Sequence, residues 1–178
     1  LYRGPDQTSI KSTKLLTLGF NRLSINNLNT GEQPLAFKSK GEEGFSYICF
    51  NGEIFNYKEL ESTYLDSPYS RDEITVLAEL FKLFSFDFVR LLNGQFSILI
   101  FSRPDNKLAL IRDPIGIRPL FYSSKLADKR LLVGSDLKSF WNYGLNKNVN
   151  IKELSRLHLT WSNSCSSTIW ESVNQVHP

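Results

Sequence analysis

Apolar and polar residues alternate from residue 14 to residue 25, which is the pattern of a half-buried strand. The segment from 14 to 25 reads KLLTLGFNRLSI, and one predicted strand face carries Leu16, Leu18, Phe20, Arg22 and Ser24. The next segment, NNLNTGEQPLAF, is rich in Asn, Gly and Pro and predicts a loop. The run GFSYICFNGEIF then predicts a second strand that is broken at Asn51–Gly52.

The apolar spacing becomes helical from 73 to 84, where one stripe carries Ile74, Leu77, Phe81 and Phe84. Ser70 and Glu73 have the spacing of a capping box at the start of this helix. A second short helix, FDFVRLL, leads into the apolar strand NGQFSILIF.

Two hairpins are predicted after the helices. NGQFSILIF pairs with NKLALIRD through the turn RPDN, and PLFYSS pairs with RLLVGS. Ser135 or Asp136 is expected to cap a helix over LKSFWNYG. Strands that are apolar on both faces indicate a sheet buried between layers, so the elements together predict an α+β layered sandwich.

Composition narrows the class of protein. The 178 residues are 41% hydrophobic, which is enough for one compact domain with a sizeable core. The net charge of +3 comes from scattered basic residues, so we expect neither a nucleic-acid nor a membrane partner. The sequence shows no signal peptide or transmembrane run, and we expect a cytoplasmic protein.

The two cysteines, Cys49 and Cys165, have neither metal-ligand spacing nor the pattern of a disulfide framework. We therefore expect no metal site, and Cys49, inside an apolar strand, is expected to be an inert core thiol. The chain contains no methionine, and we expect it to be a piece of a longer polypeptide.

Four segments, in order, resemble the asparagine synthetase family, and specifically its N-terminal class II glutamine amidotransferase domain. They are YRGPD (2–6), FNRLSI with GEQPL (20–35), NGEIFNYKEL (51–60) and IRDPIGIRPLFY (111–122). Amidotransferases that act on sugar phosphates or phosphoribosyl pyrophosphate share the RDPIGIRPL type of segment. The segments RGPD, NRLSI and EQPL point to the asparagine synthetase branch.

The resemblance implies a four-layer αββα fold of the N-terminal-nucleophile hydrolase type. It implies an amidotransferase domain over 1–143 without its N-terminal strand, and a connection over 144–178 towards an absent synthetase domain. No cofactor is expected in this domain, and Mg-ATP is expected in the synthetase domain. The implied partners are glutamine and that C-terminal domain, and a homodimer is compatible with the sequence.

In this family a cysteine at the first position of the mature chain attacks the glutamine amide. Neither Cys49 nor Cys165 stands where the resemblance requires that nucleophile. Two hypotheses follow. The chain is either the glutaminase domain of an enzyme that amidates a carboxylate, with aspartate as the family default, or a catalytically inactive scaffold domain of a synthetase without the cysteine.

The Asn51–Gly52 pair has two interpretations. An Asn-Gly pair between strand-like segments favours a hairpin turn. The resemblance instead implies that the Asn51 amide and the Gly52 N–H form the oxyanion hole of the glutaminase. Glu53 is either a solvated charge at the strand end or, by resemblance, a neighbour of the substrate's α-amino group.

Arg22 is an inward cation on a strand, and such a charge is costly unless it is paired. It forms either a structural salt bridge or a fork-shaped clamp on the α-carboxylate of glutamine. The resemblance favours the clamp, and by the same resemblance Leu23 and Ile25 contact the substrate.

Glu73 also has two interpretations. Counted back from Asn93–Gly94, it falls where the family has an aspartate that binds the substrate ammonium. It also fits the capping box, because a helix start favours negative charge. Asp72 competes for the ammonium, so the choice between the two stays open. Arg112, Asp113 and the corner from 114 to 120 are expected to be architectural.

Overall fold

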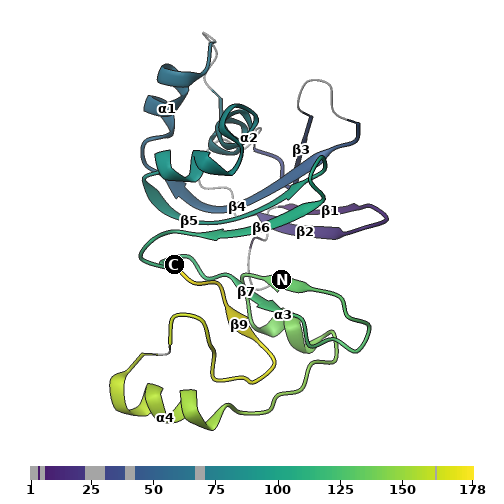
Figure 1. Cartoon of the computed structure of the whole chain (residues 1–178), viewed down its shortest axis with the longest axis vertical. Helices are drawn as coiled ribbons and strands as arrows, with labels where there is room; N and C mark the ends of the chain where they lie inside the picture. Colours follow the sequence, from purple (N-terminus) through teal and green to yellow (C-terminus); the bar gives the residue numbers. More distant parts are fainter. Residues whose placement is uncertain (1–3, 5–6, 23–30, 39–42, 67–70, 163) are drawn as a thin grey trace. The chain divides into compact units, whose positions relative to one another are not determined.

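The computed structural model describes residues 4, 7–22, 31–38, 43–66, 71–162 and 164–178 (Figure 1). They form two compact units, Leu1–Gly94 with Ile98–Ala109, and Gln95–Ser97 with Leu110–Pro178.

The first unit begins with an antiparallel hairpin of β1 (Gln7–Ser12) and β2 (Thr17–Arg22). Leu18 is buried and Phe20 is half-buried, so the predicted apolar face is confirmed for these two residues. Strand β1 was not predicted, because five of its six residues are exposed and the segment has no alternation of apolar and polar positions.

A four-stranded sheet follows in the order β3-β4-β5-β6. Its strands are β3 (Leu35–Phe37), β4 (Ser46–Ile54), β5 (Gly94–Ser102) and β6 (Lys107–Arg112). Strand β3 lies in the segment predicted as a loop and runs antiparallel to β4, with Leu35 opposite Ile48. Its three residues are too few for a periodic signal. The predicted hairpin from β5 to β6 is confirmed, and Asn106 N–H donates to Arg103 C=O across the turn.

The predicted break of the strand at Asn51–Gly52 is wrong. Both residues lie inside β4, which continues to Ile54, so the pair is not a hairpin turn. Gly52 has a φ of 146°, in the region that favours glycine, and an L side chain would be strained there. The glycine of the Asn-Gly pair therefore allows an unusual backbone conformation within a strand.

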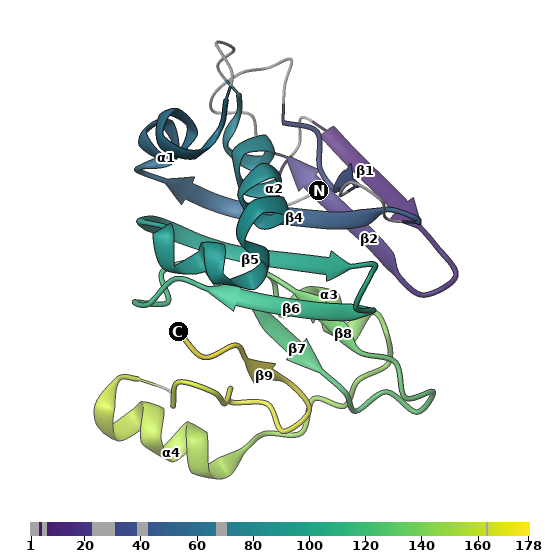
Figure 2. The same cartoon turned by 45° about the horizontal axis from the view of Figure 1, so that its top comes forward.

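Three helical segments follow β4 along the chain: α1 (Tyr57–Tyr64), α2 (Glu73–Phe84) and the 3₁₀ helix η1 (Ser85–Leu91). Figure 2 shows α2 lying across β4, and the predicted stripe is buried at Ile74, Leu77 and Phe81. Phe81 packs edge-to-face on Phe37, with ring centroids 5.7 Å apart. Helix α1 was not predicted, because Leu60 is its one buried apolar residue and gives no periodic stripe.

The predicted capping box is also wrong. The N-cap of α2 is Asp72, whose Oδ1 accepts a hydrogen bond of 2.9 Å from Thr75 N–H. Glu73 is the first residue of the helix rather than its third, and Ser70 lies outside the described residues. The aspartate can cap because its backbone is extended at that position, as an N-cap requires.

The second unit contains a three-stranded sheet in the order β8-β7-β9, built from β7 (Phe121–Ser123), β8 (Leu132–Gly134) and β9 (Asn174–Gln175). The hairpin of β7 and β8 is confirmed, and β9 adds the far end of the chain antiparallel to β7. The short helix α3 (Lys138–Trp141) places Phe140 in a core with Leu145 and Val173. The carboxylate of Asp136 accepts from Lys138 N–H at 3.1 Å, so it bonds the first turn, although Leu137 is the N-cap.

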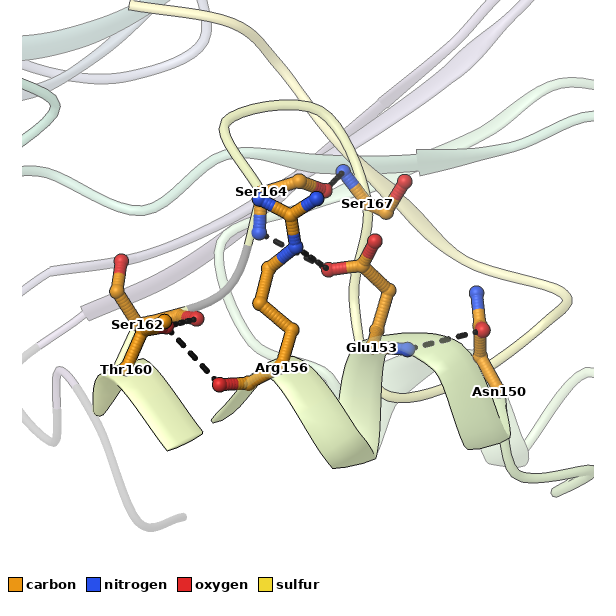
Figure 3. A network of polar contacts seen from close by, with 7 residues as sticks. All are labelled: Asn150, Glu153, Arg156, Thr160, Ser162, Ser164 and Ser167. Carbon is orange, nitrogen blue, oxygen red and sulfur yellow. Dashed lines mark hydrogen bonds and ion pairs between the residues drawn. The ribbon is translucent and has the colours of Figure 1, made fainter. Parts of the chain in front are cut away.

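Helix α4 (Ile151–Thr160) lies in the segment 144–178, for which no helix was predicted. Its polar network is shown in Figure 3: Asn150 caps the helix at Glu153 N–H, and Glu153 Oε2 accepts from Ser164 N–H at 2.9 Å. The bond from Ser164 lowers the pKa of Glu153 below its ordinary value. This buried carboxylate therefore holds the loop that follows α4 against the helix. Among the described residues, no helix is long and apolar enough to span a membrane.

Candidate active site at the end of strand β4

The predicted oxyanion-hole residues lie at the end of β4. Asn51 and Gly52 are half-buried, Glu53 is exposed and Ile54 is buried. Because side chains alternate along a strand, Asn51 and Glu53 share the face opposite to Phe50 and Ile54, which lie in the core. The strand therefore presents an amide and a carboxylate together, two residues apart.

Glu73 reaches the same strand end from α2. Its Oε1 accepts a hydrogen bond of 3.1 Å from Ile54 N–H. Burial raises the pKa of Glu73, the bond from Ile54 opposes the rise, and the negative charges of Glu53 and Asp72 add to it. The structure therefore brings three carboxylates into one electrostatic neighbourhood beside Asn51 and Gly52. A cationic group such as an ammonium would be stabilised there.

Asp72 and Glu73 have different contacts. Asp72 uses Oδ1 to cap α2, whereas Glu73 is bonded to the strand that carries the candidate donors. The capping role proposed for Glu73 therefore belongs to Asp72. Which of the two would bind a substrate amine stays a prediction.

The segment before β5 lies directly against this strand end. Phe55 N–H donates to Asn93 C=O at 2.8 Å. A Cβ atom added at Gly94 would lie far inside van der Waals contact with the carbonyl oxygen of Glu53, and 3.0 Å from the Cα of Ile54. The sequence did not predict a contact of Asn93 or Gly94 with this strand. The signal for this contact was a glycine immediately before an apolar strand.

The EQPL segment also contacts β4. Gln33 Oε1 accepts a hydrogen bond of 2.6 Å from Phe50 N–H, one residue before Asn51. Ser9 of β1 donates its hydroxyl to Gln33 C=O. Two of the recognised sequence segments, EQPL and NGEIF, therefore meet at this strand, and the first hairpin supports them.

Arg22, Leu23 and Ile25 are the three other residues predicted to contact the substrate. Arg22 ends β2 opposite Gln7, but its side chain lies outside the described part of the chain, as do Leu23 and Ile25. Their contact with glutamine stays a prediction.

The corner from Arg112 to Leu120 is held by buried charges. Asp113 is 1% exposed, and its two carboxylate oxygens accept from the N–H groups of Phe96, Ile115, Ile117 and Arg118. Burial raises the pKa of Asp113, but the backbone hydrogen bonds, led by Ile117 and Arg118, bring it below its ordinary value.

The Arg112 guanidinium donates to the carbonyl groups of Gly116, Arg118 and Val176. Both side chains bind backbone, which agrees with the predicted architectural role.

Cys49 lies on the same face of β4 as Asn51. Burial raises the pKa of its thiol to about 12. The thiol is therefore protonated at neutral pH and is a poor nucleophile, as predicted, although Cys49 is half-buried rather than a member of the core. Among the described residues, no group of three His, Cys, Asp or Glu side chains could hold a metal ion.

Comparisons with known proteins give one consistent answer. The chain is 34% identical over 143 residues to asparagine synthetase [glutamine-hydrolyzing] 2 of Bacillus subtilis (strain 168), which covers 80% of this chain and 18% of that protein. It is 33% identical over 142 residues to a probable asparagine synthetase of Acanthamoeba polyphaga mimivirus, and the match covers 77% of this chain and 25% of that protein. It is 30% identical over 138 residues to asparagine synthetase [glutamine-hydrolyzing] of Brassica oleracea, and the match covers 77% of this chain and 23% of that protein. The chain thus spans a quarter or less of the length of these relatives.

Solved structures agree on the fold. Glutamine phosphoribosylpyrophosphate amidotransferase of B. subtilis, complexed with ADP and GMP, superposes with a TM-score of 0.59 at 24% identity and covers 72% of this chain and 29% of that chain. A structure described as the allosteric regulatory enzyme of purine biosynthesis superposes with a TM-score of 0.53 at 25% identity. It covers 63% of this chain and 25% of that chain. The predicted α+β class, of the N-terminal-nucleophile hydrolase type, is confirmed.

A family model described as "Glutamine amidotransferase domain" matches residues 1–178. This match agrees with the recognised sequence segments and with the relatives, and the chain belongs to the glutamine amidotransferase domain family.

Proposed function

We propose that the chain is the glutaminase domain of an asparagine-synthetase-like enzyme. It hydrolyses glutamine to glutamate and ammonia, and the ammonia serves the ATP-dependent amidation of a carboxylate, with aspartate as the acceptor. The observation that carries the proposal is the placement of Asn51 and Gly52 at the end of β4 beside the carboxylates of Glu53 and Glu73.

Asn51 and Gly52 have the chemistry of an oxyanion hole. When a nucleophile attacks the side-chain carbonyl of glutamine, negative charge develops on the oxygen. The amide N–H of Asn51 and the backbone N–H of Gly52 would donate to that oxygen, and such donors act mainly in the transition state. The missing side chain at Gly52 leaves room for the substrate to approach the backbone.

The two charged ends of glutamine need opposite partners. Glu53 and Glu73 would hold the α-ammonium, with Asp72 contributing negative charge nearby. Arg22 would clamp the α-carboxylate through a bidentate contact, and Leu23 and Ile25 would contact the rest of the substrate. This assignment uses every predicted substrate residue once.

The remaining parts of the reaction belong to the complete protein. We propose that an N-terminal cysteine supplies the nucleophile and that a C-terminal synthetase domain binds Mg-ATP and the acceptor. The amidotransferase domain would occupy 1–143, and 144–178 would lead to the synthetase. A cytoplasmic location and a homodimer belong to the same proposal.

The test is glutamate release from glutamine by the full-length protein. Replacing Asn51 by Ala should lower kcat by a factor on the order of 10²–10³, because one oxyanion donor is lost. The matched control is Asn142→Ala at an exposed asparagine after α3, which should leave the rate unchanged.

The alternative is an inactive scaffold domain. The residue after the initiator methionine of the full gene separates the two hypotheses, because the enzyme needs a cysteine there. The proposed function would be contradicted if the full-length protein has that cysteine but releases no glutamate from glutamine. It would also be contradicted if Asn51→Ala leaves the glutaminase activity unchanged.

A further inference from the structure

Asn56 occupies the N-cap position of α1 but does not cap that helix. Asparagine is among the favoured N-cap residues because its side-chain oxygen accepts from the second or third helical N–H. Here the Asn56 side chain makes no cap hydrogen bond, and the residue has φ −101° and ψ 18°. Its side-chain amide forms hydrogen bonds with other partners instead of with the first turn of α1.

Those partners are backbone groups 35 and 37 residues away in the sequence. Asn56 Nδ2 donates to Leu91 C=O at 2.9 Å, and Asn56 Oδ1 accepts from Asn93 N–H at 2.9 Å. A carbonyl and an N–H that flank one residue are what a strand backbone offers to a neighbouring peptide group. The Asn56 side chain therefore acts as a substitute peptide group and extends the pairing between β4 and the chain before β5.

This contact reaches the candidate oxyanion donors in a few steps. The residue before Asn56, Phe55, donates its N–H to Asn93 C=O at 2.8 Å, so that Asn93 is bonded at both its backbone groups. The next residue, Gly94, packs so closely on the carbonyl group of Glu53 that no Cβ atom would fit between them. The strand end from 51 to 54 is thus held against the segment from 91 to 94, and Asn56 closes the contact.

We propose that Asn56 is a positioning residue that holds the Asn51 and Gly52 donors in their catalytic geometry by locking the end of β4 to the 91–94 segment. The inference rests on the proposed function, because it assigns Asn51 and Gly52 to the oxyanion hole. Asn56 itself touches neither substrate nor reacting atoms. Its effect is to remove the freedom of the strand end, because small displacements of donors are costly in catalysis.

The experiment compares Asn56→Asp and Asn56→Ser in the full-length protein. Both residues are good N-caps, so a helix-capping role predicts that both behave like the wild type. Aspartate keeps the acceptor for Asn93 N–H but places an oxygen against Leu91 C=O, and serine is too short to span the two partners. The matched control is Asn142→Asp, at an exposed asparagine in the other unit.

Two readouts are measured. For glutamine hydrolysis, both Asn56 variants should lower kcat by roughly 10- to 100-fold while KM changes by less than about threefold, because oxyanion donors act mainly on the transition state. Amide hydrogen exchange of the 51–56 segment should become faster in both variants, and Asn142→Asp should change neither readout.

Wild-type kcat and wild-type exchange in Asn56→Asp and Asn56→Ser would overturn the inference. Faster exchange with an unchanged kcat would show that the lock exists but does not position the donors, and it too would overturn the inference. A wild-type protein that hydrolyses no glutamine would overturn the proposed function and the catalytic part of this inference. The exchange readout would then decide whether the lock exists.

Discussion

The carboxylate of Glu73 accepts a hydrogen bond of 3.1 Å from the backbone N–H of Ile54. This single contact ties the first residue of α2 to the last residue of β4. It places a negative charge beside the strand end that carries Asn51 and Gly52, and it gives Glu73 both a structural and an electrostatic role.

The two roles of Glu73 can be separated by substitution. Glu73→Gln keeps a carbonyl oxygen for Ile54 N–H but removes the charge, whereas Glu73→Ala removes both. We expect Glu73→Gln to raise KM for glutamine roughly 10-fold with little loss of stability, because the ammonium loses a charged partner. Glu73→Ala should in addition lower the free energy of unfolding by about 1 kcal/mol.

The measurements are glutaminase kinetics of the full-length protein and urea unfolding of the 178-residue chain. The control is Glu59→Gln, at an exposed glutamate on α1. An unchanged KM in Glu73→Gln would assign the ammonium contact to another carboxylate, with Asp72 as the first candidate.

The pKa of Glu73 also predicts how stability depends on pH. Burial raises its folded pKa above the ordinary value of 4.5, so between the two values the folded protein holds a proton that the unfolded chain has released. The contribution of Glu73 to stability is therefore greatest below 4.5 and falls as the pH rises through the folded pKa. Glu73→Gln does not titrate and lacks this dependence.

The expected result is that the free energy of unfolding of Glu73→Gln, minus that of the wild type, increases as the pH rises from 4.5 through the folded pKa of Glu73 and then becomes constant. Urea unfolding of both proteins across this range measures the difference. A difference that is flat or falls with pH would show that the pKa of Glu73 is not raised.

Gly94 should tolerate no side chain. The Cβ of alanine would collide with the backbone of Glu53 and Ile54, which cannot move as a flexible side chain can. We expect Gly94→Ala to lower the free energy of unfolding by about 1–3 kcal/mol and to reduce kcat by displacing the strand end.

Gly19→Ala is the matched control, because a Cβ there would meet nothing within 4 Å. It should leave activity unchanged, and stability should stay the same or rise slightly because the unfolded chain loses freedom. Equal effects of the two substitutions on urea unfolding would contradict the close contact at Gly94.

The two cysteines should differ in reactivity. Cys165 is exposed, whereas burial raises the pKa of Cys49 to about 12, and alkylation requires the thiolate. Iodoacetamide at about pH 8, near the ordinary pKa of cysteine, should therefore modify Cys165 first and Cys49 only after urea is added. Peptide mass spectrometry reads both sites, and Cys165→Ser should remove the fast phase. Rapid modification of Cys49 in the folded protein would show that its thiol is accessible and ionised.

Local pattern was enough to predict several parts of this protein. The helical stripe of Ile74, Leu77 and Phe81, the β5–β6 hairpin and the β7–β8 hairpin each carry their signal within one short segment. The family was recognisable for the same reason, because its segments are contiguous and occur in order.

The elements that were missed carry weak local signals. Strand β1 is almost wholly exposed, β3 has three residues, and β9 has two residues and exists through its pairing with β7. Each of these strands is stabilised by pairing with a partner strand outside its own segment, and periodicity within the segment cannot reveal that partner.

By itself, the sequence determined the α+β class, the family and the identity of the candidate donors Asn51 and Gly52. Only the tertiary structure decided that these two residues lie within a strand, that Asp72 caps α2, and that Glu73 and Asn56 bind the backbone near the strand end. The physical reason is that each side chain could satisfy several hydrogen-bond partners. Folding selects the partner by bringing distant backbone groups into reach.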